Sequence, residues 1–401
     1  MDYHPASGLM IVTFLRVRPG VPITLGAFCT TDYPTAGSSP KIWRFPNPFA
    51  NELRSSDFEF ITDKDGLKKL NPLLKPDEQW DDSVIFPDEV ERIISVYQVT
   101  IDEKCNRVYF VDNGQVTYNL NTTYVMQKPA LVVVELPTDG CSARNFPIIR
   151  RAEFPDGIAA KGSDGFSHIA LDHQPGDSCD DLFLYIPNIF HKYLTVYDYK
   201  ENEFWTIEHE TFQPVIAESN FIFDETLAYD LALGPLSIAL GHADENGEKT
   251  VYYASIASTG LYAVSTKVLR DKSKSNEIQH SEDFRIIGYR GCDHQILKTI
   301  IDDTHGVMFF SEVQSNQIRC WNMSKPLNSD NIGVVYESKD LKFGLQMFID
   351  SLGYLWFHST RLPLIYKTDL PLNLDEVNSR IFRVKVTDAI RGTICVNEQE
   401  V

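Results

Sequence analysis

The sequence predicts an all-β fold built from repeated units, and three observations support this. Segments rich in β-branched and aromatic residues recur along the chain, for example at 108–111, 130–135 and 182–186. The periodicity of amphipathic helices is scarce. A unit also repeats in which an alternating strand ends in an apolar residue followed by Asp, and a polar turn then leads into a second apolar strand.

The repeated unit has four clear copies and a degenerate fifth copy at 229–234. The clear copies end at Asp102, Asp172, Asp302 and Asp350. Three or four short strands cannot cover both of their faces alone, so the units are expected to pack radially around an axis. Strands expected at 9–17, 22–30 and 41–45 supply most of a sixth unit. We therefore predict a six-bladed β-propeller with a central ligand channel, formed by residues 1–401 as a single domain.

Three stretches set the expected boundaries of this propeller. Only seven residues precede Gly8, so the inner strand of the first blade is expected to be missing or to come from elsewhere. Residues 381–387 are a candidate for that closing strand. Residues 50–92, rich in Asp, Lys, Pro and Leu, are expected to form a long excursion between blades.

Charge and hydropathy exclude several classes of partner. The chain has 56 acidic and 37 basic side chains, a formal net charge of −19, which repels nucleic acid and anionic lipid. No apolar run approaches the ~18 residues that a membrane span needs. We therefore expect no nucleic-acid partner and no membrane partner. We also expect a monomer. The start of the sequence has neither the basic nor the apolar region of a signal peptide, so any such peptide is expected to be absent from this chain.

Six collinear motifs are similar to those of the Yellow and major royal jelly protein family. They are G-V-P-I-T-L at 20–25, S-V-Y-Q-V-T-I-D-E at 95–103 with V-D-N-G at 111–114, Y-Y-A-S-I-A-S-T-G-L-Y at 252–262, C-W-N at 320–322, L-W-F-H-S-T-R-L-P at 355–363 and N-S-R-I at 378–381. The resemblance spans residues 8–397 and implies a secreted, extracellular six-bladed propeller.

The resemblance also implies a pattern of disulfides. It pairs Cys105 with Cys179 and Cys320 with Cys395, which leaves Cys29, Cys141 and Cys292 free. Two sequons, at Asn121 and Asn322, fit a secreted glycoprotein.

Polar residues recur at one position of the repeat. Four residues before the repeat Asp, or before its equivalent Gly234, the sequence has Gln98, His168, Asp230, Lys298 and Gln346. Alternation along a strand turns such residues to one side, so a polar ring lining or capping the channel is expected. The alternative is that they are strand-end groups paired with neighbouring backbone.

The resemblance suggests what this ring binds. In family members that bind amines, contacts come from positions matched here by Gln346 and Thr360, where Thr360 replaces the usual Asn or Asp. Phe348, with Trp356, Phe357 and Phe221, is available as an aromatic wall, although each also fits a core position. The first hypothesis is therefore a secreted Yellow-like protein that binds a small aromatic amine or catechol-derived molecule, such as a biogenic amine or a melanin-pathway metabolite.

Three other functions remain open. Dopachrome conversion needs only proton transfers, which His168 and Asp230 could supply without a cofactor. Motifs of hydrolases, metalloenzymes and NTPases are missing from the sequence, and no metal or other cofactor is expected. A calcium-dependent lactonase of similar shape would use Asn113, Asn188 and Asp230 as oxygen ligands. A structural or nutritive role would leave the channel blocked.

Overall fold

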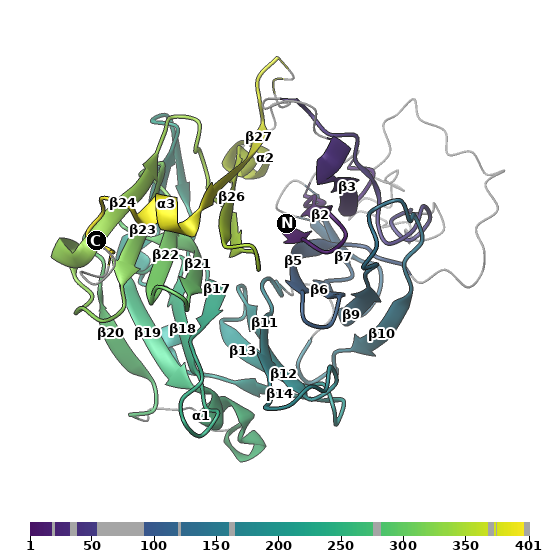
Figure 1. Ribbon diagram of the computed structural model, residues 1–401, viewed down its shortest axis with the longest axis horizontal. Coiled ribbons are helices and arrows are strands. Elements are labelled where there is room, and N and C mark those ends of the chain that lie inside the picture. Colours follow the sequence, from purple (N-terminus) through teal and green to yellow (C-terminus); the bar gives the residue numbers. More distant parts are fainter. Residues whose placement is uncertain are drawn as a thin grey trace, which may run out of the picture. The chain divides into compact units, whose positions relative to one another are not determined.

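The computed structural model describes residues 1–17, 21–32, 38–53, 92–118, 122–159, 165–275, 282–367, 373 and 375–396. The chain divides into two compact units, Met1–Asp164 and Gly165–Val401, which are described separately (Figure 1). Most of the excursion predicted at 50–92 lies outside the described residues. No helix among the described residues is long and apolar enough to cross a membrane.

The first unit contains two four-stranded antiparallel sheets and a small hairpin. The first sheet has the order β1 (Asp2–His4), β2 (Leu9–Thr13), β3 (Leu25–Cys29) and β4 (Trp43–Arg44), with a 3₁₀ turn, η1 (Thr30–Asp32), after β3. The second sheet has the order β5 (Val96–Asp102), β6 (Arg107–Asp112), β9 (Ala130–Glu135) and β10 (Ile148–Glu153). The hairpin consists of β7 (Gln115–Tyr118) and β8 (Thr122–Val125).

The second unit contains four more sheets in chain order. They are β11 (Ala170–His173), β12 (Leu182–Asn188), β13 (Tyr193–Asp198) and β14 (Glu203–Ile207); β17 (Pro235–Leu240), β18 (Thr250–Ser255), β19 (Gly260–Ser265) and β20 (Arg285–Tyr289); β21 (Ile296–Asp302), β22 (Val307–Glu312), β23 (Gln317–Asn322) and β24 (Ile332–Glu337); and β25 (Gln346–Ile349), β26 (Tyr354–Thr360) and β27 (Ser379–Lys385). These four blades and the two of the first unit confirm the predicted fold class, a six-bladed β-propeller.

The second unit also has a two-stranded hairpin and several short helices. The hairpin, β15 (Asn220–Phe223) and β16 (Leu227–Asp230), lies in the chain between the blades that begin at β11 and β17. The helices are α1 (Thr266–Arg270), α2 (Leu362–Lys367) and α3 (Val386–Ile390), and the 3₁₀ turns are η3 (Glu210–Phe212), η4 (Ile216–Glu218), η5 (Lys272–Lys274) and η6 (Ser329–Asn331). Among the described residues helix is thus confined to short segments outside the sheets, as the scarcity of helical periodicity predicts.

Buried central strands explain the apolar runs in the sequence. In β22 every residue from Val307 to Glu312 is buried, and β9 is buried from Ala130 to Val134. A short continuous apolar run is expected for a strand covered on both faces. In the second unit β17 packs beside β11 and β21, and β21 packs beside β25. The first strand of each blade is therefore its inner strand.

The structure corrects the two expectations about the first blade. A short inner strand is present, because β1 pairs with β2 in the register Asp2↔Ile11 and His4↔Leu9. The carboxylate of Asp2 also accepts a hydrogen bond from Ile101 N at 2.7 Å, which holds β1 beside β5. The closing role suggested for 381–387 is wrong, because most of this stretch belongs to β27, which pairs with β26 as the third strand of the last sheet.

Candidate functional site

The second unit carries one buried polar side chain at an equivalent position of each inner strand or, for His168, two residues before it. We call the set His168, Ser237, Lys298 and Gln346 the inner-strand polar row. Their exposed fractions are 9%, 5%, 3% and 3% in that order. The row contains three of the five residues predicted for the polar ring, and Ser237 is a member that sequence reasoning missed.

A shared irregularity in two inner strands identifies Ser237 as a member of the row. The pairing of β21 with β22 shifts between Ile296 and Lys298, and the pairing of β17 with β18 shifts between Pro235 and Ile238. Such shifts bend a strand and re-aim the side chain at that point. Ser237 in β17 is therefore the counterpart of Lys298 in β21.

Hydrogen bonds connect the first three members across neighbouring blades. The Nδ1 atom of His168 accepts a long hydrogen bond, 3.5 Å, from the backbone N of Ile238, the residue after Ser237. Ser237 Oγ lies 3.3 Å from both the backbone O and the backbone N of Thr299, the residue after Lys298. These hydrogen bonds keep His168, Ser237 and Lys298 side by side in three neighbouring blades.

Ser311 connects Lys298 with the strand that carries Gln346. Lys298 pairs with Ser311 between β21 and β22. The hydroxyl of Ser311 donates to the backbone O of Gly344, two residues before Gln346. A Cβ at Gly344 would lie 2.1 Å from Ser311 Oγ, so only glycine allows this approach. The row therefore continues into the last blade of the unit.

The electrostatics of the row make His168 neutral. Burial, and then the positive charge of Lys298, lower the pKa of His168 well below its ordinary value. Because Nδ1 accepts from Ile238 N, the proton of the neutral ring belongs on Nε2, which is then a donor. His168 thus adds a hydrogen-bond donor to the row rather than a positive charge.

Gln346 holds a buried polar atom that the described part of the chain does not satisfy. No hydrogen-bond partner for Gln346 Nε2 is present among the described residues, although the atom is buried. An unsatisfied buried donor costs about 1–3 kcal/mol, and such groups in native proteins call for an explanation, such as a water, an ion or a ligand. Together with the Nε2 donor of His168, Gln346 gives the row hydrogen-bond donors, which suits a ligand with acceptor oxygens.

The two other predicted contacts lie on the same blade as Gln346. Phe348 follows Gln346 by two residues in β25, so both side chains project from one face. The Phe348 ring stacks on Trp356 with 6.0 Å between centroids. Thr360 ends β26, and its backbone N donates to Phe343 O at 3.2 Å. Thr360 therefore lies beside the segment that leads into Gln346.

Comparison with known proteins now identifies the family. The profile of the major royal jelly proteins matches residues 94–395. This chain belongs to the Yellow/major royal jelly protein family.

Relatives of known name fall into two groups. The Yellow-related salivary protein ASP4 of Phlebotomus orientalis is 36% identical over 312 residues, which cover 76% of this chain and 74% of the relative. The salivary protein ASP2 of the same organism is 32% identical over 395 residues, covering 98% and 86%. The L-dopachrome tautomerase yellow-f of Drosophila melanogaster is 28% identical over 393 residues, covering 97% and 80%.

The inner-strand position predicted for Asp230 in this Yellow-family chain is wrong. Asp230 is the last residue of β16, in the β15–β16 hairpin, and it is exposed. Its carboxylate accepts from Ser219 Oγ at 2.6 Å and from Ala232 N at 3.3 Å. The segment 229–234 shows the same apolar alternation as the true strand β17, and the pairing shift in β17 obscured the correct register. Asp230 therefore does not share an inner-strand position with His168 or with the other members of the row.

In the first unit, Gln98 occupies the position equivalent to the row. The pairing of β5 with β6 shifts between Val96 and Val99, as in β17 and β21, and Gln98 is only 2% exposed. The predicted contribution of Gln98 to ligand binding stays a prediction.

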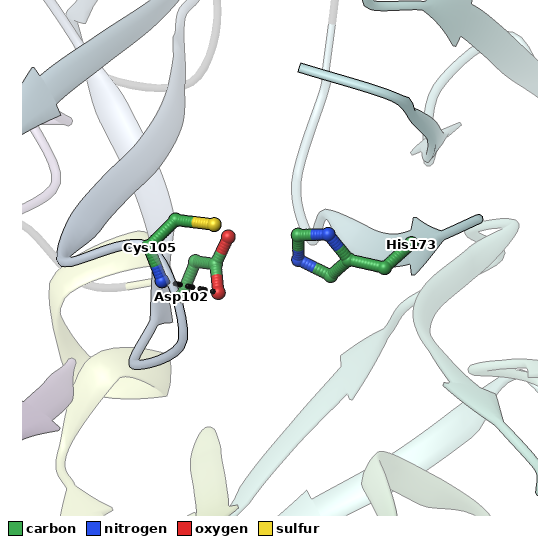
Figure 2. Close-up of side chains that lie close together, drawn as sticks. All are labelled: Asp102, Cys105 and His173. Atoms are coloured by element: carbon green, nitrogen blue, oxygen red, sulfur yellow. Dashed lines mark hydrogen bonds between the residues drawn. The ribbon is translucent and has the colours of Figure 1, made fainter. Parts of the chain in front are cut away.

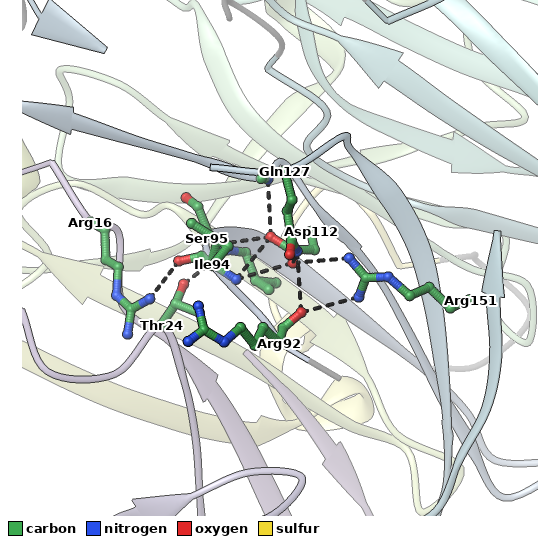
Figure 3. Close-up of polar contacts among 10 residues, drawn as sticks. Arg16, Thr24, Arg92, Ile94, Ser95, Asp112, Gln127 and Arg151 are labelled. Carbon is green, nitrogen blue, oxygen red and sulfur yellow. Dashed lines mark hydrogen bonds and ion pairs between the residues drawn. The ribbon is translucent and has the colours of Figure 1, made fainter. Parts of the chain in front are cut away.

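The first unit also contains a buried carboxylate that sequence reasoning missed. Asp112 is fully buried and accepts hydrogen bonds from Ile94 N at 3.0 Å, Ser95 N at 2.9 Å and Gly114 N at 3.0 Å. Gln127 Nε2 donates to it at 2.5 Å, and Arg151 lies 3.7 Å away as an ion-pair partner (Figure 3). The only signal in the sequence was the Asp-Asn-Gly that ends an apolar strand.

A second buried charge in this network joins the two ends of the excursion. Arg16, 1% exposed, donates to the backbone O of Ile94 at 2.8 Å and to the backbone O of Asn51. Ile93 N donates to Ala50 O at 2.8 Å. Burial lowers the pKa of Arg16 to about 10, so the guanidinium stays charged at neutral pH. The Asp112 carboxylate and the Arg16 guanidinium thus both hold backbone segments in place.

The cysteines agree only in part with the predicted disulfides. Cys320 pairs with Cys395, as predicted, and Cys292 is free. Cys29 and Cys141, predicted to be free, form a disulfide with a Cα–Cα distance of 5.8 Å. Their separation of 112 residues left no pattern in the sequence that would have paired them.

The remaining predicted pair, Cys105 and Cys179, contains no free thiol. Both residues are disulfide-bonded. Cys105 lies in the turn after β5, where its backbone N donates to Asp102 Oδ1 at 3.2 Å (Figure 2). The repeat Asp of this copy therefore caps the turn that follows it, which is the ordinary use of Asp in a tight turn.

The structure also describes Asn188, a predicted calcium ligand, and Asn322, one of the two predicted glycosylation sites. Asn188 Oδ1 accepts from Gly165 N, Phe190 N and His191 N, so this oxygen serves the turn after β12 rather than a calcium ion. Asn322 is 2% exposed and its Nδ2 donates to Cys395 O at 3.4 Å, and its glycosylation stays a prediction. Asn121 lies outside the described residues.

Proposed function

We propose that this Yellow-family protein is secreted and binds a small catechol-derived aromatic molecule, through its oxygen atoms, at the inner-strand polar row. The observation that carries the proposal is the buried Nε2 of Gln346, which has no partner among the described residues. A ligand oxygen placed there would remove the cost of leaving that donor unsatisfied.

The charge of the row favours catechol-type oxygens over an ammonium group as the anchoring atoms. Lys298 is buried and its positive charge acts on His168. In such a setting an ammonium beside Lys298 is repelled, whereas a phenolate, a quinone oxygen or a carboxylate is attracted. A biogenic amine such as dopamine would therefore bind with its ring oxygens towards the row and its amine directed away from Lys298.

Two further features support secretion. Cys29–Cys141 and Cys320–Cys395 are disulfides, and such bonds persist mainly in oxidising compartments. Relatives at 36% and 32% identity are named salivary proteins.

Dopachrome conversion is the second candidate, favoured by the relative yellow-f, which aligns with 97% of this chain. The reaction moves a proton from carbon to oxygen, so donors beside a quinone oxygen would stabilise the developing negative charge. It also needs a base. His168 Nδ1 already accepts from Ile238 N, so the neutral ring acts as a donor in this arrangement. For this reason we rank binding above catalysis.

Calorimetric titration with matched ligands tests the proposal. We would compare 3,4-dihydroxyphenylacetate, dopamine and phenethylamine, which differ only in their oxygens and amine. The expected order of affinity is dihydroxyphenylacetate, then dopamine, then phenethylamine, with the last weaker than dopamine by at least about tenfold, because each lost charge-assisted hydrogen bond is worth about 1.5–3 kcal/mol. Equal affinity for dopamine and phenethylamine would refute oxygen-anchored binding, and no binding by any ligand would favour a structural or nutritive role.

Turnover distinguishes the second candidate from the first. The loss of dopachrome is followed with wild-type protein and with His168→Gln. A rate above the spontaneous one that falls in the variant would favour dopachrome conversion, whereas the spontaneous rate in both would leave binding alone.

A further inference from the structure

The β15–β16 hairpin has one buried aromatic face and one exposed face. Phe221, Phe223 and Tyr229 are 1%, 3% and 8% exposed, whereas Ile222, between the first two, is 55% exposed. Phe221 pairs with Tyr229 in the hairpin register, and the two rings stack with 5.6 Å between centroids. A two-stranded hairpin cannot bury a face by itself, so this aromatic face is covered by other parts of the protein.

The base of the hairpin is held to the start of strand β21. Glu218, two residues before β15, accepts a hydrogen bond on its backbone O from Gln295 Nε2 at 3.2 Å. Its carboxylate accepts from Thr259 N at 2.6 Å. Gln295 directly precedes β21, whose third residue is Lys298.

The tip of the hairpin is held by the last two blades of the unit, β21–β24 and β25–β27. Ile222 N donates to Gln314 Oε1 at 2.8 Å. Asp224, at the turn, forms an ion pair with Lys342, and a second one with Arg361 at 3.7 Å. Lys342 lies four residues before Gln346, and Arg361 directly follows Thr360.

These anchors all lie at one end of the inner strands. Gln295 at the base and Lys342 at the tip precede β21 and β25, and Lys298 and Gln346 lie at the beginning of those strands. The hairpin therefore lies at the end of the unit from which β21 and β25 begin. The hydroxyl of Tyr229 is buried there and has no hydrogen-bond partner among the described residues.

We propose that the β15–β16 hairpin is a cover over the inner-strand polar row, and that the ion pairs of Asp224 with Lys342 and Arg361 are the latch that controls access to it. The identity of the ligand that reaches the row rests on the proposed function. The existence of the latch does not depend on that function. The side chains of Asp224, Lys342 and Arg361 are 34%, 21% and 17% exposed. Such partly exposed pairs are weakened by salt, so the cover opens more often at high ionic strength.

The turn itself permits a clean test of the latch. Asp224 and Glu225, in the three-residue turn between Phe223 and Leu227, have φ values of 50° and 65°. Asn tolerates this backbone at least as well as Asp. Asp224→Asn therefore removes the charge and keeps the turn. Asp181→Asn is the matched control, because Asp181 forms an exposed ion pair with Lys200 at 3.0 Å on another blade.

Thiol labelling measures access to the row without a ligand. A Gln346→Cys substitution puts a reactive thiol in the row, and Cys292→Ser removes the free cysteine. The rate of reaction with a small neutral maleimide is then measured with Asp224 intact, with Asp224→Asn and with Asp181→Asn. We expect Asp224→Asn to raise the rate by about threefold to tenfold, the range for losing one or two exposed ion pairs, and Asp181→Asn to leave it unchanged.

Salt provides a second arm of the same experiment. Raising NaCl from about 50 mM to about 1 M should speed labelling with the latch intact and have little effect in Asp224→Asn, because the screened interaction is already gone. Equal rates for Asp224→Asn and the intact latch would overturn the proposal. Failure of dopamine and dihydroxyphenylacetate to bind would overturn the proposed function instead and would leave these rates unaffected.

Hydrogen exchange keeps the latch testable if the Gln346→Cys protein does not fold. In chains with the natural Gln346, the amide of Ile222, which donates to Gln314, should exchange faster in Asp224→Asn than in Asp181→Asn. Identical exchange in the two variants would contradict a latch at Asp224.

Discussion

Two buried polar regions of this protein are built differently. In the first unit, Asp112 accepts three backbone N–H groups and the Gln127 amide and lies 3.7 Å from Arg151. In the second unit, Gln346 is buried to a similar degree, yet its Nε2 has no partner among the described residues. The carboxylate of Asp112 is hydrogen-bonded by other groups of the protein. The Nε2 donor of Gln346 is left available for a ligand.

The difference separates structural polarity from functional polarity. A buried carboxylate is stable only when paired and hydrogen-bonded, and Asp112 meets both conditions while fixing residues 94 and 95 at the start of β5. A buried donor without a partner destabilises the free protein, so its retention suggests a use outside folding. Burial alone would not distinguish the two regions. The hydrogen-bond partners of the Asp112 carboxylate, and their absence among the described residues for Gln346 Nε2, distinguish these two side chains.

The largest effect should follow from breaking the satisfied region. Asp112→Ala leaves three backbone N–H groups and Arg151 without their acceptor, and we expect the free energy of unfolding to fall by about 3–5 kcal/mol. Chemical denaturation measures this. Asp181→Asn, at an exposed ion pair, should cost less than about 1 kcal/mol. A comparable loss in both variants would mean that the Asp112 network does not stabilise the unit.

A smaller effect should appear in the pH dependence of stability. Burial lowers the folded-state pKa of His168 and lowers that of His358 to about 3. Below the unfolded value of about 6.5 the unfolded chain binds protons that the folded chain does not, so stability falls with falling pH by up to about 1.4 kcal/mol per unit for each histidine. This loss is absent above pH ~6.5.

Glutamine substitutions test the assignment of this slope. His168→Gln should reduce the loss of stability between about pH 6 and pH 4, and adding His358→Gln should reduce it further, because each removes a group that titrates only in the unfolded chain. Thermal melts across this range supply the measurement. Curves for wild type and variants that stay parallel would show that neither ring is kept neutral by the fold.

The smallest effect is expected at Asp230. This carboxylate is exposed on the outward side of β16 and is bonded to Ser219 and Ala232, so Asp230→Asn should change the affinity for dopamine by less than about twofold. Titration calorimetry at low and moderate salt is the measurement. A tenfold loss would return Asp230 to the binding site and weaken the distinction between the hairpin and the inner strands.

The fold could be predicted because a repeat carries more information than any single strand. The count of six blades came from four Asp-terminated copies, the degenerate copy at 229–234 and the strands expected at 9–17, 22–30 and 41–45, where the structure has β2, β3 and β4. The strand β1 was missed because three residues, Asp2–His4, are too few to show alternation. It forms because β2 and β5 provide pairing and packing that no local pattern reveals.

The candidate site was predictable only where the strand register was regular. His168, Lys298 and Gln346 were found by counting back from the repeat Asp. Ser237 was missed because its strand is followed by Gly241 rather than Asp and because its pairing is shifted. The cover formed by the hairpin was also missed, because its anchors Gln314, Lys342 and Arg361 follow it by about a hundred residues and only the fold brings them together.

The most direct test of the central claim compares stability and affinity in Gln346→Leu. If Gln346 Nε2 is held for a ligand, replacing the amide with a similar apolar side chain should leave the free energy of unfolding unchanged or raise it by about 1 kcal/mol. The affinity for 3,4-dihydroxyphenylacetate should fall by about tenfold or more, because a hydrogen bond to a charged group is worth about 1.5–3 kcal/mol. A variant that loses stability and keeps its affinity would contradict the account, since Gln346 would then be a structural residue like Asp112.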